Sequence, residues 1–281
     1  MSTDPILALV DGQPATVLCV LDRALHYGDG LFETIACRNS QACFLELHLQ
    51  RLAAGCARLG IRYEDFPALA AKLREIAAAQ PRSIIKLILT RGSATARGYG
   101  AGGDEQARTV LLQYPWPPED PQLWAAGVVA RTASARWGEN PLLAGLKHLN
   151  RLEQVLARAE WTDPSIQEAL VFSSSGWLVS GTMSNVFLIR DGRIMTPAIT
   201  HAGVRGVMRR VVIGAVQAAG VAITETALDA PAVLAAQEIF VTNARIGIWP
   251  IRELDGRALP IGPITRQLQQ RLRPLLEAAH A

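Results

Sequence analysis

Two neighbouring segments constrain the fold most, because no helix or strand can continue through either of them. Residues 91–108 read RGSATARGYGAGGDEQAR, and their glycines favour a loop. Residues 113–122 read QYPWPPEDPQ, and their four prolines favour an extended conformation. We therefore expect an interdomain linker at 115–122, between a small domain at 1–114 and a larger domain at 123–281.

Length and composition agree with two globular domains. A chain of 281 residues can form two domains that each bury a core. Hydrophobic residues make up 49% and charged residues 19%, which is typical of folded rather than disordered proteins. Because 28 basic side chains face 25 acidic ones, we expect no nucleic-acid partner and no polyphosphate-binding surface.

The first residues of the chain bear on its location in the cell, and the cysteines bear on whether it binds a metal ion. The first residues, MSTDPILALVDGQPA, resemble no signal peptide, and no segment is apolar for long enough to span a membrane. We therefore expect a cytoplasmic protein with no membrane partner. The four cysteines form no CxxC pair and have no histidine at metal-ligand spacing, so we expect no metal site.

Hydrophobic patterns predict both strands and helices, and hence an α/β fold. Apolar or alternating runs bounded by turn residues predict strands at 6–10, 16–21, 31–37, 42–45, 84–90, 109–114, 127–132, 168–172, 185–190 and 238–242. Helical spacing predicts helices at 46–59, 67–79, 150–161, 207–219 and 265–279. In the third of these, Asn150 and Glu153 have the pattern of a helix cap, and Leu149, Leu152, Leu156 and Ala159 would share one face.

The phosphate-binding signals are local and modest. Neither GxxxxGK[ST] nor a strand-linked GxGxxG is present, so nucleoside triphosphates and dinucleotides are not expected. Gly206 directly precedes an apolar helix whose first N–H groups could bind a single phosphate. The same pattern is also typical of a plain N-cap glycine. Arg51, on an amphipathic helix, is by itself equally compatible with a solvated charge.

Lys147 is a candidate nucleophile. It lies in GLKHL (145–149), a passage from strand to helix with few charges. Desolvation there would free its amine for attack on an aldehyde, although a single lysine is more often a surface charge. Residue patterns alone therefore indicate a two-domain α/β protein with a site for a small anion.

Eight segments occur in an order that is typical of one superfamily. They are YGDGLFET (27–34), LHLQRL (47–52), LTRGSATARGY (89–99), AGLKHLNRLEQVLAR (144–158), EALV (168–171), GTMSNVF (181–187), GVRGVMRR (203–210) and TNARIGIWPI (242–251). Together they resemble the fold type IV pyridoxal-phosphate-dependent enzymes. Among these, the chain resembles the aminodeoxychorismate lyases most closely, because aminotransferases of this fold diverge from the segment KHLNRLEQVLAR. The resemblance implies a small N-terminal domain of sheet and helices and a larger C-terminal domain with a barrel-like sheet.

The resemblance also implies which residues bind the cofactor, pyridoxal 5'-phosphate. Lys147 would form the Schiff base with it and move the substrate proton, and Arg51 would clamp its phosphate. The remaining phosphate contacts would come from the backbone amides of Val207 and Met208 and from a second turn formed by Asn243 and Ala244. Relatives more often have a hydroxyl residue near Ala244.

Ser180 departs from the family pattern. Most relatives have a glutamate there, which pairs with the pyridine nitrogen and keeps it protonated so that the ring can accept electrons. Serine can hydrogen-bond this nitrogen but cannot hold the proton by charge. A carbanion that collapses at once by elimination needs less help from the ring than one that must persist for transamination, so Ser180 favours a lyase.

The implied reaction converts the small molecule 4-amino-4-deoxychorismate into 4-aminobenzoate and pyruvate, a step of folate biosynthesis. The substrate has two carboxylates, and Arg91 and Arg97 lie in the loop where relatives bind carboxylates. Tyr27 and Tyr99 would form walls of the pocket. By analogy with relatives we expect a homodimer. Two alternatives stay open: an aminotransferase for branched-chain or D-amino acids, and a non-catalytic pyridoxal-phosphate-binding protein.

Overall fold

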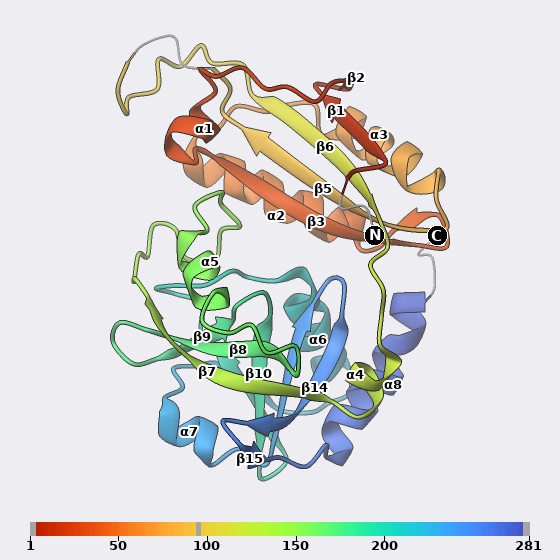
Figure 1. Ribbon diagram of the computed structural model, residues 1–281, viewed down its shortest axis with the longest axis vertical. Coiled ribbons are helices and arrows are strands. Elements are labelled where there is room, and N and C mark those ends of the chain that lie inside the picture. Colours follow the sequence, from red (N-terminus) through yellow and green to blue (C-terminus); the bar gives the residue numbers. More distant parts are fainter. Residues whose placement is uncertain (1–3, 94–96, 278–281) are drawn as a thin grey trace. The chain divides into compact units, whose positions relative to one another are not determined.

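The computed structural model describes residues 4–93 and 97–277. Two compact units can be followed along the colour gradient of Figure 1. The first contains the described residues up to Pro118, Leu146–Asn150 and the end of the last helix, and the second contains Glu119–Gly145 and Arg151–Leu275. No helix among the described residues combines the length and the apolar character that a bilayer crossing requires.

The first unit is built on an antiparallel sheet with the strand order β2-β1-β6-β5-β3-β4. Its strands are β1 (Leu7–Val10), β2 (Gln13–Pro14), β3 (Gly30–Arg38), β4 (Gln41–Ala42), β5 (Arg82–Thr90) and β6 (Arg108–Pro115). The central strand β5 is rich in isoleucine and leucine, and Ile85, Leu87 and Leu89 are fully buried. Branched apolar side chains of this kind favour a strand that is covered by other elements.

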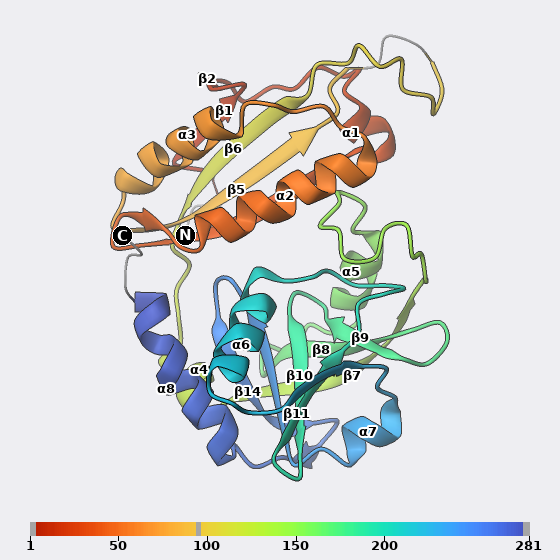
Figure 2. The same cartoon turned by 180° about the vertical axis from the view of Figure 1, so that it is seen from behind.

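Two long helices, α2 (Leu45–Leu59) and α3 (Phe66–Ala78), lie along one face of this sheet (Figure 2). Their buried residues recur at helical spacing, as predicted. The side chain of Asp65 accepts a hydrogen bond from the Ala68 amide at 3.1 Å and caps α3, with Pro67 in the first turn. A short helix, α1 (Arg23–Tyr27), precedes β3.

The second unit is built on a mixed nine-stranded sheet with the order β12-β11-β10-β13-β14-β7-β8-β9, and β15 pairs with β14. The strands are β7 (Val128–Trp137), β8 (Ile166–Ser173), β9 (Leu178–Gly181), β10 (Asn185–Arg190), β11 (Arg193–Pro197), β12 (Ile223–Thr226), β13 (Glu238–Asn243), β14 (Gly247–Leu254) and β15 (Arg257–Ala258). Strand β9, at one end of the order, also contacts β10 and β11 near the other end. The sheet therefore curls, and the expected α/β class with a barrel-like sheet is confirmed.

The helices of the second unit cover this curled sheet. They are α4 (Pro121–Ala125), α5 (Leu152–Arg158), α6 (Val207–Ala218), α7 (Ala230–Leu234) and α8 (Pro263–Glu277). Helix α6 packs against β12 and β13, and α5 packs against β7 and β8. Inside the sheet the rings of Phe187 and Phe240 stack with their centroids 4.8 Å apart.

The strand expected at 16–21 is not formed. Val17 and Val20 are 78% and 70% exposed, and no described strand pairs with this segment. An apolar run forms a strand only where another strand accepts its backbone hydrogen bonds, and this segment has no such neighbour among residues 4–93 and 97–277. The strand expected at 42–45 is also shorter than predicted, because Leu45 already begins α2.

The helix expected at 150–161 is shorter and is capped differently. It begins after Arg151, whose side chain makes no cap hydrogen bond. The side-chain amide of Asn150 instead donates to the Gly28 carbonyl at 3.2 Å, and the Glu153 carboxylate accepts from the backbone amide of Gly138 at 2.7 Å. Leu152 and Leu156 are 77% and 65% exposed, so the predicted apolar face is not covered by this chain. The last helix begins at Pro263, and positions 278–279 of its prediction lie outside the described residues.

Candidate active site

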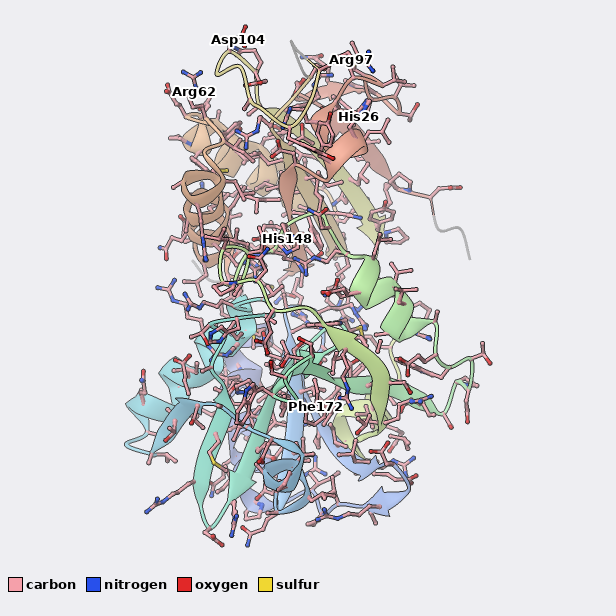
Figure 3. All side chains as sticks on the ribbon, turned by 90° about the vertical axis from the view of Figure 1, so that its left-hand side faces the viewer. His26, Arg62, Arg97, Asp104, His148 and Phe172 are labelled. Carbon is pink, nitrogen blue, oxygen red and sulfur yellow. The ribbon has the colours of Figure 1, made fainter. Side chains whose placement is uncertain are left out.

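Lys147 lies in a segment that pairs with the edge of β3. The Phe32 amide donates to the Lys147 carbonyl at 2.9 Å, and the Leu149 amide donates to the Gly30 carbonyl at 3.0 Å. His148, labelled in Figure 3, belongs to the same segment. Residues 146–150 therefore pack with the first unit, whereas the sequence placed them in a domain spanning 123–281. The reason is this backbone pairing, which joins residues far apart in the chain.

The amine of Lys147 is half-buried and lies over an aromatic ring. Its Nζ is 4.1 Å from the centroid of the Phe32 ring, a geometry in which the ring face attracts a cation. The chain contains three lysines. Lys72 pairs with Glu75 on α3 at 2.6 Å, and Lys86 on β5 lies 5.8 Å from the same Phe32 ring. Phe32 is thus flanked by Lys147 and, at greater distance, by Lys86.

Arg51, on α2, is held by a carboxylate from β3. Its Nε donates to Oε1 of Glu33 at 2.8 Å, and its Nη2 pairs with Oε2. His48, one turn earlier on α2, contacts Oε2 of Glu33 through Nδ1 at 2.6 Å. Helix and strand approach closely because Gly55 faces Leu31: an added Cβ at Gly55 would lie 2.7 Å from the leucine side chain.

Charge and burial define the protonation states in this cluster. Burial alone would raise the pKa of Glu33, but the Arg51 charge and the His48 hydrogen bond outweigh it and bring the pKa to about 2. Burial lowers the pKa of His48, although its hydrogen bond to Glu33 acts in the opposite direction. His48 is therefore neutral near neutral pH, and Nδ1 carries the proton because an ionised carboxylate only accepts.

The N-terminus of α6 has the features of a phosphate site. Its N-cap is Gly206, so no side chain caps the amides of the following residues, Val207 and Met208. A Cβ at Gly206 would lie 2.1 Å from Oδ1 of Asn185, so only glycine fits there. Asn185 also donates to the Val204 carbonyl at 2.9 Å and fixes the chain entering the helix. These features fit the single phosphate of the implied cofactor.

Ser180, on β9, is buried beside a turn that a buried carboxylate organises. Its hydroxyl donates to the Gly181 carbonyl at 2.7 Å. Glu168, on β8, accepts hydrogen bonds from the Thr182 amide at 2.9 Å and from the Ser184 hydroxyl at 2.7 Å. It also accepts from its neighbour Ala169 and from the hydroxyl of Thr182. Glu168 thus holds the turn at 182–184 through these hydrogen bonds.

Asn243 and Ala244 lie at the end of β13, in the same unit. The Asn243 side chain accepts from the amides of Arg245 and Ile246, both at 3.0 Å, and donates to the Met183 carbonyl at 3.2 Å. Ala244 is half-buried in this turn. Within the second unit, the structure therefore joins the turn of Asn243 and Ala244 to the turn that follows Ser180.

The glycine-rich loop is anchored by a charged network around Asp29. Arg91 donates to Asp29 at 2.7 Å and to the carbonyls of Leu59 and Gly60 at 2.8 and 2.7 Å. Arg23 donates to Asp29 at 2.8 Å and to the Tyr99 carbonyl at 2.9 Å. Burial would raise the pKa of Asp29, but the hydrogen bonds from both arginines hold it below its ordinary value.

The other loop residues are more open. Arg97 is exposed, and Figure 3 labels it together with Asp104 at the loop. The ring of Tyr99 is also exposed, and its centroid lies 5.3 Å from that of Tyr27 in a tilted arrangement. Thus the loop presents Arg97 to solvent, while the guanidinium of Arg91 is bonded inside the network.

Sequence reasoning did not single out Glu33, His48, Glu168 or Asp29. A usable signal existed for two of them, because Glu33 and Glu168 are acidic residues inside otherwise apolar strands. A buried carboxylate needs partners, so an acidic residue at such a position indicates a specific role. Most of the hydrogen-bond partners of these carboxylates lie on other elements, so the local sequence pattern could not identify them.

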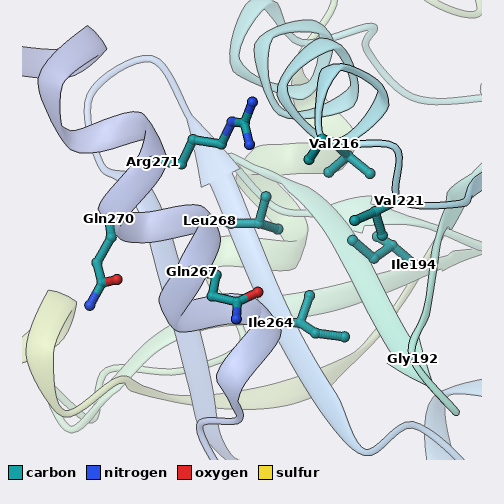
Figure 4. Close-up of a pocket in the computed structure, with 10 residues that line it drawn as sticks. Gly192, Ile194, Val216, Val221, Ile264, Gln267, Leu268, Gln270 and Arg271 are labelled. Atoms are coloured by element: carbon teal, nitrogen blue, oxygen red, sulfur yellow. The ribbon is translucent and has the colours of Figure 1, made fainter.

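A hollow lies elsewhere in the second unit. It has a volume of about 590 Å³ and is lined by residues of β11, α6 and α8, including Ile194, Val216, Leu268 and Arg271 (Figure 4). None of the predicted site residues lines it. Among the described residues, no group of three His, Cys, Asp or Glu side chains is arranged to bind a metal ion.

Comparison with known proteins identifies the family. The pattern described as "Amino-transferase class IV" matches residues 30–254. The chain therefore belongs to the class IV aminotransferase family. Within this family it is 32% identical over 272 residues to an aminodeoxychorismate lyase from Vibrio harveyi, covering 94% of this chain and 98% of the relative. A D-alanine aminotransferase from Bacillus licheniformis is 29% identical over 260 residues, which cover 90% and 89% of the two chains.

Solved structures show the same relationship. The crystal structure of 4-amino-4-deoxychorismate lyase from Pseudomonas aeruginosa is 43% identical with a TM-score of 0.93, covering 97% of this chain and all of that one. The branched-chain amino acid aminotransferase of Escherichia coli shares the fold, with 21% identity, a TM-score of 0.83 and coverage of 95% and 93%.

Proposed function

We propose that this protein is a pyridoxal-phosphate-dependent lyase that converts 4-amino-4-deoxychorismate into 4-aminobenzoate and pyruvate. One observation supports this most: the chain is 43% identical, over 97% of its length, to a solved 4-amino-4-deoxychorismate lyase. Solved branched-chain aminotransferases of the same fold are 21% and 24% identical. The lyase reaction is therefore preferred to transamination.

Lys147 is assigned to the reacting centre. When bound, pyridoxal phosphate supplies an aldehyde that condenses with amines and a ring that accepts electrons. Lys147 would hold the cofactor through its Nζ, and the same amine, once displaced, would take the proton from ring carbon 4 of the substrate. Departure of the enolpyruvyl group as pyruvate leaves an aromatic ring. Pairing with β3 and contact with Phe32 orient the lysine for both roles.

The phosphate of the cofactor is assigned to residues suited to an anion. In the first unit, the planar guanidinium of Arg51 is suited to a charge-assisted pairing with phosphate, and Glu33 fixes its orientation. In the second unit, the uncapped amides of Val207 and Met208 point their partial positive charge out of α6. The turn of Asn243 and Ala244 is assigned to the same role.

Ser180 is assigned to the pyridine nitrogen. Its hydroxyl donates to the Gly181 carbonyl in this structure, and on rotation it can instead donate to an unprotonated pyridine nitrogen. Such a partner cannot keep a proton on the nitrogen, and the ring is then a weaker electron acceptor. Elimination with aromatisation tolerates this better than transamination does, which supports the lyase assignment.

The two substrate carboxylates are assigned to arginines of the loop. Arg97 is exposed and can turn toward an anion, whereas Arg91 is held by Asp29 and two carbonyls and acts mainly by shaping the loop. Tyr27 and Tyr99 lie close enough to form one aromatic wall.

A homodimer in the cytoplasm completes the proposal. Apolar side chains are exposed in both units, at Val17, Val20, Leu21 and Leu25 in the first and at Leu152, Val155 and Leu156 on α5 in the second. Exposed apolar surface of this extent favours an interface with a second copy. All four cysteines are free thiols, which fits a reducing compartment. Sedimentation velocity of the purified protein tests the dimer.

Product analysis tests the function. Protein loaded with pyridoxal phosphate should release 4-aminobenzoate and pyruvate from 4-amino-4-deoxychorismate in equal amounts, without any added 2-oxo acid. Lys147→Ala should abolish both products, and Lys86→Ala, the matched control, should retain them. Turnover only of branched-chain or D-amino acids, and only with a 2-oxo acid, would instead identify an aminotransferase. Cofactor binding without either activity would identify a non-catalytic binding protein.

A further inference from the structure

Glu33 is buried, with 1% of its surface exposed, and it bonds to two residues of α2. Oε1 of Glu33 accepts from Nε of Arg51 at 2.8 Å. Oε2 of Glu33 accepts from both Nη2 of Arg51 and Nδ1 of His48. Three positions, one on a strand and two on a helix, thus form a single hydrogen-bonded unit.

We propose that Glu33 is a positioning residue that fixes the guanidinium of Arg51 for the cofactor phosphate, and that neutral His48 fixes Glu33 in turn. The proposal rests on the proposed function, because the phosphate in question belongs to pyridoxal phosphate. Glu33 does not touch the reacting atoms. It acts through Arg51.

The geometry of arginine explains why a carboxylate is suited to this role. A guanidinium is a planar fork, so a partner that binds both Nε and Nη2 fixes the plane and the direction of the remaining N–H groups. An arginine side chain that is ordered before the ligand arrives does not lose its rotational freedom on binding. Glu33 therefore preorganises one anion-binding edge of Arg51.

His48 provides the third constraint. It is almost fully buried, and its Nδ1–H directs one oxygen of Glu33. Among the described residues, its Nε2 has no hydrogen-bond partner, so the ring has one polar contact and that contact is Glu33. A neutral imidazole orients the carboxylate without competing with Arg51 for its charge.

The charge of Glu33 also has an opposite effect, because it repels the phosphate. Two substitutions separate orientation from repulsion. Glu33→Gln keeps the size of the side chain and removes its charge, whereas Glu33→Asp keeps the charge and shortens the reach by one methylene. If orientation dominates, both substitutions weaken the binding of a phosphate. If repulsion dominates, Glu33→Gln strengthens it and Glu33→Asp leaves it unchanged.

The experiment compares two ligands on each variant. Apoprotein is titrated with pyridoxal phosphate and with pyridoxal, which lacks the phosphate, and the ratio of the two dissociation constants is measured by absorbance. This ratio reports the phosphate contribution and is independent of the fraction of protein that is folded. Glu46→Gln is the matched control, because Glu46, on α2, pairs with Arg74 of α3 and both side chains are exposed. Arg51→Ala serves as the reference for a lost phosphate clamp.

We expect Glu33→Gln and Glu33→Asp each to lower the preference for the phosphorylated ligand by roughly 10-fold or more, as loss of a charge-assisted hydrogen bond would do. Glu46→Gln should keep the wild-type ratio. A wild-type ratio in both Glu33 variants, or a stronger preference in Glu33→Gln, overturns the inference while leaving the proposed function intact. If the wild-type protein binds neither ligand, the proposed function fails and the inference fails with it.

Discussion

The backbone amide of Phe32 donates a hydrogen bond of 2.9 Å to the carbonyl oxygen of Lys147. The same strand carries Glu33 at the next position, and adjacent side chains of a strand leave it on opposite faces. Phe32 therefore contacts Lys147, while Glu33 contacts Arg51 on α2. One strand thus orients both residues to which the cofactor is assigned in the first unit.

This arrangement predicts where the cofactor attaches. Borohydride should fix pyridoxal phosphate irreversibly on the peptide that contains Lys147, because reduction converts the carbon–nitrogen double bond into a stable amine. Peptide mass spectrometry identifies the labelled lysine among the three in the chain. Labelling of Lys86, which lies farther from Phe32, would refute the assignment.

The division of roles between two arginines is a second prediction. Arg51→Ala should weaken cofactor retention strongly, since Arg51 is assigned to the phosphate and is held in place by Glu33. Arg97→Ala should retain the cofactor, because Arg97 is an exposed loop residue. Absorbance of the protein after exhaustive dialysis measures retention. Equal cofactor loss in the two variants contradicts the assignment.

The loop arginines should differ from each other in their effect on stability. Arg91→Ala should lower the free energy of unfolding by about 1–3 kcal/mol, because it removes a charged partner of the mostly buried Asp29. Arg97→Ala should change it by less than about 0.5 kcal/mol. Both should raise the Michaelis constant for 4-amino-4-deoxychorismate without cofactor loss. Urea denaturation and steady-state kinetics test this, and unchanged kinetics in both variants would remove these arginines from the substrate site.

Ser180 should matter less to the lyase than to transamination. Ser180→Glu should raise amino-acid half-reactions, because a carboxylate can hold a proton on the pyridine nitrogen. Lyase turnover should change far less than in Lys147→Ala, where loss of the acid/base is expected to cost on the order of 10²- to 10⁴-fold. Pyruvate release and half-reactions are measured side by side. A rise in lyase turnover as steep as that in transamination would show that elimination does depend on the ring charge.

The lowered pKa of Glu33 predicts a pH dependence of stability. Its pKa in the folded protein is about 2, against an ordinary value of 4.5. A carboxylate with a lowered pKa stabilises the folded state above its unfolded pKa, and this contribution is lost as the pH falls from 4.5 toward 2. The free energy of unfolding of the wild type should therefore exceed that of Glu33→Gln, by on the order of 3 kcal/mol near neutral pH. This difference should shrink as the pH falls from 4.5 toward 2.

Urea denaturation at a series of pH values measures that gap. Glu46→Gln again provides the control, since its carboxylate is exposed and its pairing with Arg74 is solvated. A gap between wild type and Glu33→Gln that stays constant down to the lowest pH would show that the ionised carboxylate is not what stabilises this cluster.

Local patterns in the sequence determined most of the secondary structure. Apolar runs predicted β3, β5 and β13, and helical spacing predicted α2, α3 and α6, because these elements depend on neighbouring residues. The strand predicted at 16–21 was wrong, because a strand also requires a second strand to pair with, and a local pattern of residues does not show whether one is present. The predicted ends of α5 were wrong for a related reason. Asn150 and Glu153 bond to distant glycines instead of capping the helix.

The sequence by itself, through residue types and the order of its motifs, determined the fold class and singled out Lys147 and Arg51. Only the tertiary structure decided how these residues are held. Lys147 pairs with β3, Arg51 shares Glu33 with His48, and Asp29 joins Arg91 to the loop. Each of these contacts joins residues on different elements, and such partners are selected by the packing of strand against helix rather than by any local pattern of residues.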